Sequence, residues 1–201
     1  MSEIAAESET KREQIIQAAT AEFQENGFAA ASMDRISARA SVSKRTVYRY
    51  FESKEALFQT LITEHWSKFA ESLSVTYEPG RDIREQLAAL GRAEGRLLTS
   101  PDVMATTRMV MSELLRSPGL AGQSQEKIDF KASFETMLSE ATADGRLDVA
   151  DPQAAAKEFL ALLKARAFWP VIFGEPVVSE EEMEQIVDSS VEMMISRYGV
   201  K

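Results

Sequence analysis

The sequence predicts an all-α protein of about nine helices, in which a small N-terminal three-helix domain precedes a larger helical domain. Apolar residues recur at helical spacing along the chain, and no stretch alternates apolar and polar residues as a half-buried strand does. Only six prolines and nine glycines interrupt the 201 residues. In addition, Ser, Thr or Asp stands before most of the apolar segments, where its side chain can cap the first turn of a helix.

The first three helices are expected within residues 11–55, which form the predicted helix-turn-helix domain. Residues 1–10 are polar and acidic and are expected to be a disordered tail. The first helix is predicted over 11–26 and should end at Gly27 in the left-handed conformation. The expected caps of the second, third and fourth helices are Ser32, Ser43 and Ser53.

The remaining residues, 56–201, are predicted to form a helical regulatory and dimerisation domain. The fourth helix should run to the break at Glu78-Pro79-Gly80, the clearest candidate for a boundary between functional units. Five further helices are expected from their first residues: one from Asp82, two at roughly 102–116 and 119–143, one from Asp151-Pro152 to near Phe173-Gly174, and one from the capping box of Ser179 and Glu182.

The charge of the chain is unevenly distributed. A net charge of −9 argues against a nucleic-acid partner unless the basic residues are concentrated. Between Ser32 and Lys54, six basic residues stand against two acidic ones, a net +4, which leaves −13 for the rest. One short cationic segment is therefore expected to make aimed contacts with phosphates, while the anionic remainder discourages loose ones.

Residues 32–51 have the pattern of a helix-turn-helix. Met33, Ile36 and Ala40 point inward from a short first helix, and Val47 and Phe51 from a second, so both helices can pack on one core. The second helix presents outward Lys44, Arg45, Thr46, Tyr48 and Arg49. Such donors and aromatic rings suit a major groove, where Arg pairs with guanine and the thymine methyl accepts apolar contacts. Each residue alone could equally be a cap, a solvated face or a core aromatic, but so many matches at fixed spacing favour DNA binding.

This stretch resembles the DNA-binding domain of the TetR family of one-component transcriptional regulators. The resemblance covers about residues 11 to 60, whereas the rest of the chain is similar only in helix number, length and its apolar last two helices. The matching features are the run from Phe23 to Phe28, the core of Met33, Ile36, Ala40, Val42 and Ser43, the run from Thr46 to Phe51, and Ser53-Lys54-Glu55-Ala56-Leu57.

The resemblance implies DNA-contacting roles for nine residues. They are Ser32, Ser43, Lys44, Arg45, Thr46, Tyr48, Arg49, Tyr50 and Lys54. Ser32 and Ser43 would cap their helices beside phosphates, and Lys54 would hold another phosphate. Arg45, where many members have glycine, would be the main residue for direct base readout.

A ligand pocket is harder to predict because Met and aromatic residues at helical spacing are ordinary core more often than not. The candidates are Trp66, Phe69, Met104, Arg108, Met111, Phe134, Met137, Phe159, Arg166 and Trp169. Arg108 or Arg166 would anchor a polar ligand in an otherwise apolar cavity. Trp66 and Phe69 lie on the fourth helix, which would have to move if a ligand is to alter DNA affinity.

A homodimer is expected because the last two helices carry wide apolar faces that a monomer would leave partly exposed. The predicted interface residues are Leu162, Phe168, Met183, Ile186, Val187, Ser190, Val191 and Met194. A two-fold dimer would read a palindromic DNA operator.

Catalytic function is not expected. The chain has no cysteine and a single histidine, His65, to which no role is assigned, and it contains no glycine-rich phosphate loop or nucleophile elbow. No metal and no cofactor are therefore predicted. The polar start and the lack of a long apolar run favour a cytoplasmic protein without membrane contact.

The expected function is a dimeric repressor that a small hydrophobic or amphipathic ligand releases from its operator. Two alternatives remain open. One is a ligand-independent DNA-binding dimer, either an activator or a partner-controlled regulator. The other is a helical protein-interaction module whose basic segment docks on an acidic protein.

Overall fold

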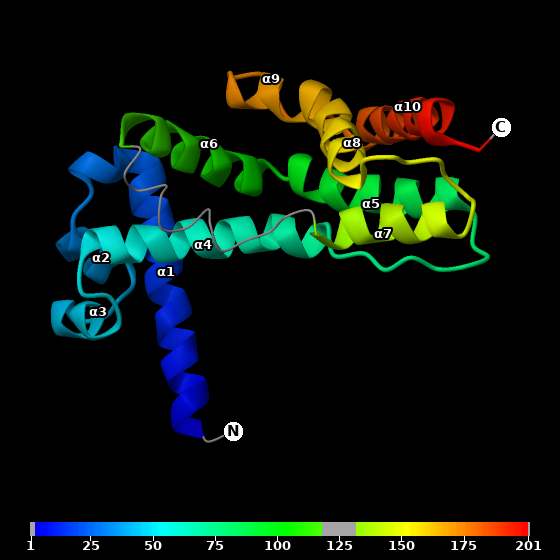
Figure 1. Cartoon of the computed structure of the whole chain (residues 1–201). Coiled ribbons are helices and arrows are strands. Elements are labelled where there is room, and N and C mark those ends of the chain that lie inside the picture. The colour runs from blue at the N-terminus through cyan, green and yellow to red at the C-terminus, as the bar shows by residue number, and fades with distance from the viewer. Residues whose placement is uncertain (1–2, 118–131, 201) are drawn as a thin grey trace. The chain divides into compact units, whose positions relative to one another are not determined.

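A computed structural model describes residues 3–117 and 132–200, which form ten helices and no strand (Figure 1). The all-α prediction is confirmed. The helices are α1 (Glu3–Ala30), α2 (Met33–Arg39), α3 (Lys44–Tyr50), α4 (Lys54–Ser72), α5 (Ile83–Leu98), α6 (Pro101–Arg116), α7 (Ala132–Ala143), α8 (Pro152–Ala167), α9 (Trp169–Ile172) and α10 (Glu180–Tyr198). The expected helix over 119–143 is described only in its last part, α7, because residues 118–131 lie outside the described residues.

The described residues divide into two compact units. The first unit contains residues 3–66 and 105–117, and the second contains 67–104 and 132–200. The division differs from both predicted boundaries, at 55/56 and at Glu78-Pro79-Gly80, because α4 and α6 each contribute to both units. A local sequence break does not mark a boundary that lies inside two continuous helices.

Helix α1 is longer than predicted. It begins at Glu3 within the segment expected to be disordered, and it resumes beyond Gly27 to Ala30. Gly27 itself has φ 71, the left-handed conformation predicted for it, and forms a kink inside the helix. The kink brings the Phe28 ring to 5.7 Å from the Phe23 ring and to 4.8 Å from the Phe58 ring.

The core of the first unit joins all of its helices. Ile15 and Phe23 of α1, Ile36 of α2, Val47 of α3 and Phe58 of α4 are completely buried. Val110 of α6 is also buried in this cluster, with Met109 and Leu114 packed against it. The later part of α6, which sequence reasoning assigned to the C-terminal domain, therefore supports the helix-turn-helix.

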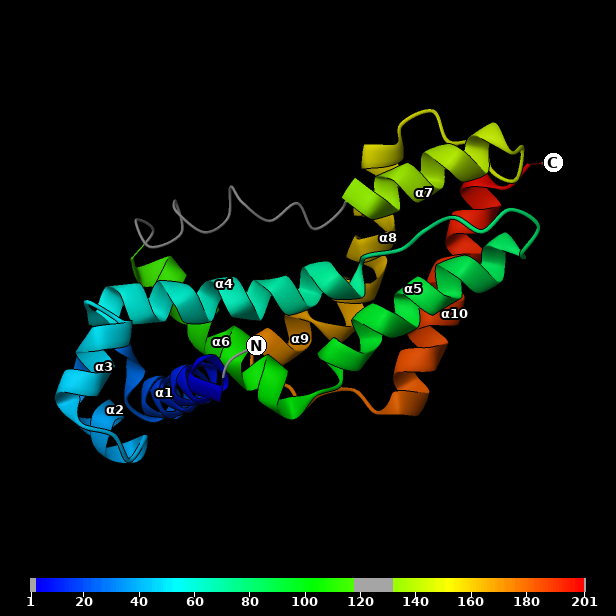
Figure 2. The ribbon, with the colours of Figure 1, turned by 90° about the horizontal axis from the view of Figure 1, so that it is seen from below.

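The second unit is built around the packing of α5 with α10 and of α8 with α7 and α10 (Figure 2). Two glycines of α5 let α10 approach closely. A Cβ at Gly91 would lie 3.0 Å from Val187, and one at Gly95 would lie 2.8 Å from Met183. The long eighth helix of the prediction is divided near Phe168 into α8 and the short α9, while α10 begins at Ser179 with the predicted capping box.

Most residues of the predicted dimer interface are buried inside the single chain. Seven of them are at most 6% exposed: Phe168, Met183, Ile186, Val187, Ser190, Val191 and Met194. Leu162 alone is partly exposed. An apolar face found in sequence has to be buried, but the sequence does not state whether the partner is another helix of the same chain.

Candidate nucleic-acid interface

The helix-turn-helix is fixed locally by its two capping serines. Ser32 Oγ accepts from the amide of Arg35 at 3.2 Å, and Ser43 Oγ accepts from the amide of Thr46 at 3.1 Å. Between them the chain turns through Ser41, whose φ of 53 lies in the left-handed region. The predicted caps of α2 and α3 are confirmed, whereas the phosphate contacts expected of these serines stay predictions.

Helix α3 has one buried and one exposed face. Val47 is completely buried in the core of the first unit, and Tyr50 packs against that core. Arg45, Tyr48 and Arg49 are exposed, with Tyr48 at 44% although it is a large aromatic residue. Three side chains that can reach into a groove are therefore carried on a helix whose other side is anchored.

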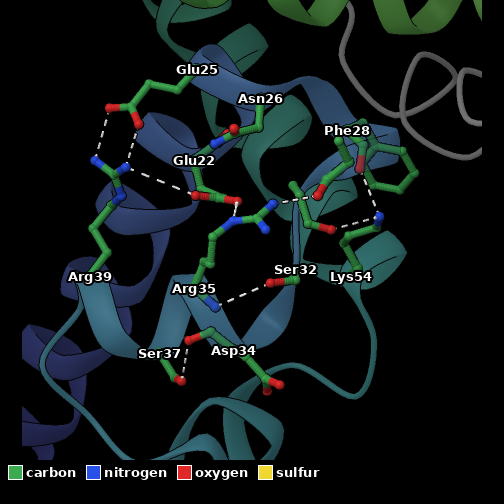
Figure 3. A network of polar contacts seen from close by, with 12 residues as sticks. Glu22, Glu25, Asn26, Phe28, Ser32, Asp34, Arg35, Ser37, Arg39 and Lys54 are labelled. Carbon is green, nitrogen blue, oxygen red and sulfur yellow. Dashed lines mark hydrogen bonds and ion pairs between the residues drawn. The ribbon is translucent and has the colours of Figure 1, made fainter.

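The basic residues of α2 are occupied within the chain (Figure 3). The Nε of Arg35 lies 2.5 Å from Glu22 Oε1, and the same guanidinium donates to the carbonyl of Ala30. Arg39 pairs with Glu25 at 2.5 Å and approaches Glu22 to 3.9 Å. Glu22 is only 1% exposed, so its charge is compensated by two arginines rather than by water.

Lys54 is also occupied within the chain (Figure 3). Its Nζ donates to the carbonyls of Phe28, Ala29 and Ala31 at 2.7, 3.2 and 3.0 Å, and lies 4.6 Å from the centre of the Phe28 ring. An ammonium group has three donors, and all three are used here. Lys54 thus closes the last turn of α1, and the predicted phosphate contact would require it to leave these carbonyls.

Lys44 makes an ion pair within the chain, but the pair is exposed. Its Nζ lies 2.6 Å from Asp34 of α2, and this hydrogen bond raises the pKa of Lys44. Both side chains are more than half exposed. Of the six cations counted in the sequence window, Arg35, Arg39 and Lys44 make ion pairs within the described residues, and Lys54 donates to carbonyls. Arg45 and Arg49 make neither kind of contact there, and the Arg49 guanidinium lies 5.2 Å from the Tyr50 ring centre.

Sequence reasoning missed Glu22 and Glu25. Both precede the cationic window and therefore did not enter its charge, although they neutralise two of its arginines. They lie 13 and 14 residues before Arg35 and Arg39, a separation that no local helix pattern reports. The tertiary contact of α1 with α2 is what reveals them.

The structure separates the pocket candidates into distinct groups. Met104, Phe134, Met137, Phe159 and Phe69 are buried within the second unit, where the rings of Phe134 and Phe159 lie 5.6 Å apart. Trp66, Arg108 and Met111 belong to the first unit.

Other candidates lie on the surface. Arg108 and Arg166 are exposed, as is Trp169, which stacks on the Phe173 ring at 6.4 Å. The predicted arginine anchors thus do not lie in the apolar interior.

Neither a membrane-crossing helix nor a metal site occurs in the described residues. No helix there has the length and apolar character needed to cross a membrane. Likewise, no three acidic, histidine or cysteine residues within 3–117 and 132–200 are grouped so that they could hold a metal ion.

The comparisons with known proteins agree with this geometry. Residues 15–61 match the family model of bacterial regulatory proteins of the tetR family, and residues 85–200 match that of the AefR-like transcriptional repressor, C-terminal domain. The chain is 41% identical over 131 residues to the HTH-type transcriptional regulator UidR of Escherichia coli (strain K12), which is 63% of each protein. Among the first curated relatives it spans 40% of YhgD of Bacillus subtilis (strain 168) and 63% of UidR.

Solved structures match over nearly the whole chain. A TetR family transcriptional regulator from Pseudomonas syringae pv. tomato str. DC3000 is 39% identical with a TM-score of 0.78, covering 94% of this chain and 97% of that one. The flavonoid-responsive regulator FrrA is 30% identical with a TM-score of 0.76, covering 96% and 98%. The chain therefore belongs to the TetR family of transcriptional regulators.

Proposed function

We propose that the chain is a homodimeric repressor that binds a palindromic DNA operator through α3 and leaves it when a small effector binds the second unit. One observation carries the DNA-binding part. Arg45, Tyr48 and Arg49 project together from α3, while Val47 on the opposite face is completely buried. A rigidly supported row of guanidinium and phenol groups is what direct readout of base edges needs.

The proposed dimer uses the outer faces of α8, α9 and α10. Seven of the eight residues first predicted for it are interior, so a second copy has to cover other side chains. The exposed small or apolar residues of these helices are Ala161, Ala165, Trp169, Phe173, Ser189 and Met193. Phe173 at 83% and Met193 at 56% exposed are large apolar side chains that a second copy could cover, and small neighbours permit close helix packing.

The effector is proposed to be a small molecule with a large apolar part. Support comes from the aromatic interior of the second unit around Phe134 and Phe159, and from the relative FrrA, whose printed name describes a flavonoid-responsive regulator. The effector would act by favouring a conformation of the dimer in which the two recognition helices no longer match adjacent turns of DNA.

The test starts from selection of bound sequences out of a random duplex library. We expect a palindromic motif, and then a loss of roughly 1–3 kcal/mol in affinity for it on Arg45→Ala, with relaxed preference at one base position. Arg96→Ala removes the same charge from the exposed surface of α5, outside the helices proposed for the dimer, and serves as the matched control. Failure to select any motif, or equal effects of the two substitutions, would contradict readout by α3.

A further inference from the structure

Glu94 is a charged residue in the interior of the second unit. It lies on the buried face of α5, and its side chain has no exposed surface. Oε2 accepts a hydrogen bond at 3.0 Å from Ser72 at the end of α4. Oε1 has no hydrogen-bond partner among the described residues.

The only opposite charge recorded near Glu94 in the described residues is that of Lys164 on α8. Its Nζ lies 3.7 Å from Oε1, too far for a hydrogen bond. The Lys164 side chain is 35% exposed, and its ammonium also lies 5.9 Å from the Phe168 ring centre. Lys164 is therefore a distant and partly hydrated counter-charge.

Apolar side chains pack on the same face of α5 as Glu94. Gly91, one helical turn earlier on the same face, lies against Val187 and the ring of Phe159. Burial accordingly raises the pKa of Glu94, with Lys164 and Ser72 only partly opposing the effect. Native interiors seldom leave a buried carboxylate oxygen without a hydrogen bond, and a perturbed buried acid is a recognised pointer to a functional site.

We propose that Glu94 is the polar recognition point of the effector site, and that the effector carries a protonated nitrogen on an apolar body. This inference rests on the proposed function, in which the second unit binds the effector. The nitrogen donates to Oε1 and displaces the ammonium of Lys164 into solvent, while Ser72 keeps its bond to Oε2. Displacement is required because the carboxylate has no exposed surface in this structure.

The sign of the buried charge in the second unit indicates which chemical class of effector it would bind. Sequence reasoning expected Arg108 or Arg166 to anchor a polar, and hence anionic or accepting, group. Both arginines are exposed, whereas the buried charge is a carboxylate. A negative, under-compensated group selects cations and hydrogen-bond donors and repels anions.

The experiment compares three fluorescent probes that share a naphthalene body: 1-naphthylmethylamine, 1-naphthalenemethanol and 1-naphthoate. Binding to the full chain is measured by fluorescence titration at neutral pH. We expect the amine to bind the wild-type protein roughly tenfold more tightly than the alcohol, and the carboxylate to bind most weakly. Glu94→Gln should abolish the preference for the amine while leaving the affinity for the alcohol unchanged.

A second variant tests displacement of the lysine. Lys164→Met removes the competing ammonium and should tighten binding of the amine several-fold. An unchanged or weaker affinity for the amine in Lys164→Met would contradict displacement, and the same rank order in Glu94→Gln as in the wild type would overturn the role of Glu94. Stronger binding of 1-naphthoate would mean that a cationic group reads the effector instead.

Operator binding without any probe separates this inference from the proposed function. If the wild type binds its selected operator but shows no preference for the amine, only the effector inference fails. If it binds no operator, the proposed function fails whatever the probes show. Circular dichroism and the thermal unfolding midpoint of each variant establish that the substitutions leave the protein folded.

Discussion

Two buried glutamates, one in each unit, differ in how closely their charges are paired. Glu22 of the first unit is 1% exposed and meets the guanidinium of Arg35 at 2.5 Å with Arg39 at 3.9 Å. Glu94 of the second unit is equally buried, yet one of its oxygens has no hydrogen bond, and its counter-charge lies 3.7 Å away. The first carboxylate is closely compensated, whereas the second is compensated only in part.

The difference follows the tasks that we propose for the two units. A DNA-reading element has to hold its helices in one geometry, which a closely paired charge between α1 and α2 enforces. An effector site has to gain free energy when a ligand arrives, and a carboxylate with an unused acceptor provides that gain. A buried charge is thus evidence of rigidity in one place and of recognition in another, and the partner distances distinguish the two.

The largest expected effect comes from removing the ion-pair partner of the buried Glu22. Arg35→Ala removes its main partner and leaves the carboxylate buried, which should lower the free energy of unfolding by about 3 kcal/mol. Glu22→Gln should cost less, because Arg35 is half exposed and can be hydrated. Urea denaturation measures both. The double variant should cost less than the sum of the single variants, and strict additivity would show that the pair is not coupled.

A second variant tests whether Lys54 is a structural or a DNA-contacting residue. Lys54→Met removes three charged hydrogen bonds to the end of α1, and we expect a loss of roughly 1.5–3 kcal/mol in unfolding free energy. If Lys54 instead holds a phosphate, its loss would leave stability nearly unchanged and reduce the salt dependence of operator binding by about one phosphate contact. Denaturation and binding at several salt concentrations separate the two roles.

For Glu94 we expect substitution to raise the unfolding free energy instead of lowering it. Its pKa is raised by burial, so the protonated form is favoured in the folded state; the corresponding stability is present below the ordinary pKa of 4.5 and is lost as pH rises through the raised value. Glu94→Gln should therefore increase the unfolding free energy at neutral pH by about 1 kcal/mol and flatten its pH dependence. Glu184→Gln, which breaks an exposed pair with Arg92, is the control. A loss of stability in Glu94→Gln would show that the pair with Lys164 outweighs the cost of burial.

The fold was largely predictable because its information is local. Caps such as Ser32, Ser43 and Asp82, and the capping box at Ser179, specify helix starts through contacts within one turn. Unit boundaries were not predictable, since the later part of α6 joins the first core through Val110, a long-range contact.

The candidate interface was predicted less completely because some of its contacts are also long-range in sequence. That Arg45, Tyr48 and Arg49 point outward follows from helical spacing around Val47, and the structure places them so. That Arg35, Arg39 and Lys54 are occupied inside the chain does not follow from spacing, because their partners belong to α1 and its last turn. A count of charges in a window gives the number of cations but not how many are available to DNA.

The smallest expected effect concerns the exposed pair of Asp34 and Lys44. It tests directly whether a cation that is paired within the chain is less available to DNA. Asp34 holds the Lys44 ammonium at 2.6 Å on the surface of α2, so Lys44 has to leave this partner before it contacts a phosphate. Asp34→Asn should therefore raise affinity for non-operator DNA by a few-fold and steepen its salt dependence by about one phosphate contact, with little change in stability.

The control for Asp34→Asn is Asp148→Asn, which changes the net charge equally at an exposed position outside the helices proposed for the dimer. If both variants strengthen non-operator binding alike, the effect comes from net charge and not from release of Lys44. If only Asp34→Asn does so while affinity for the selected operator rises less, the ratio of operator to non-operator binding falls. Asp34 then serves specificity by keeping one cation of the recognition helix occupied until a matching site offers a better partner.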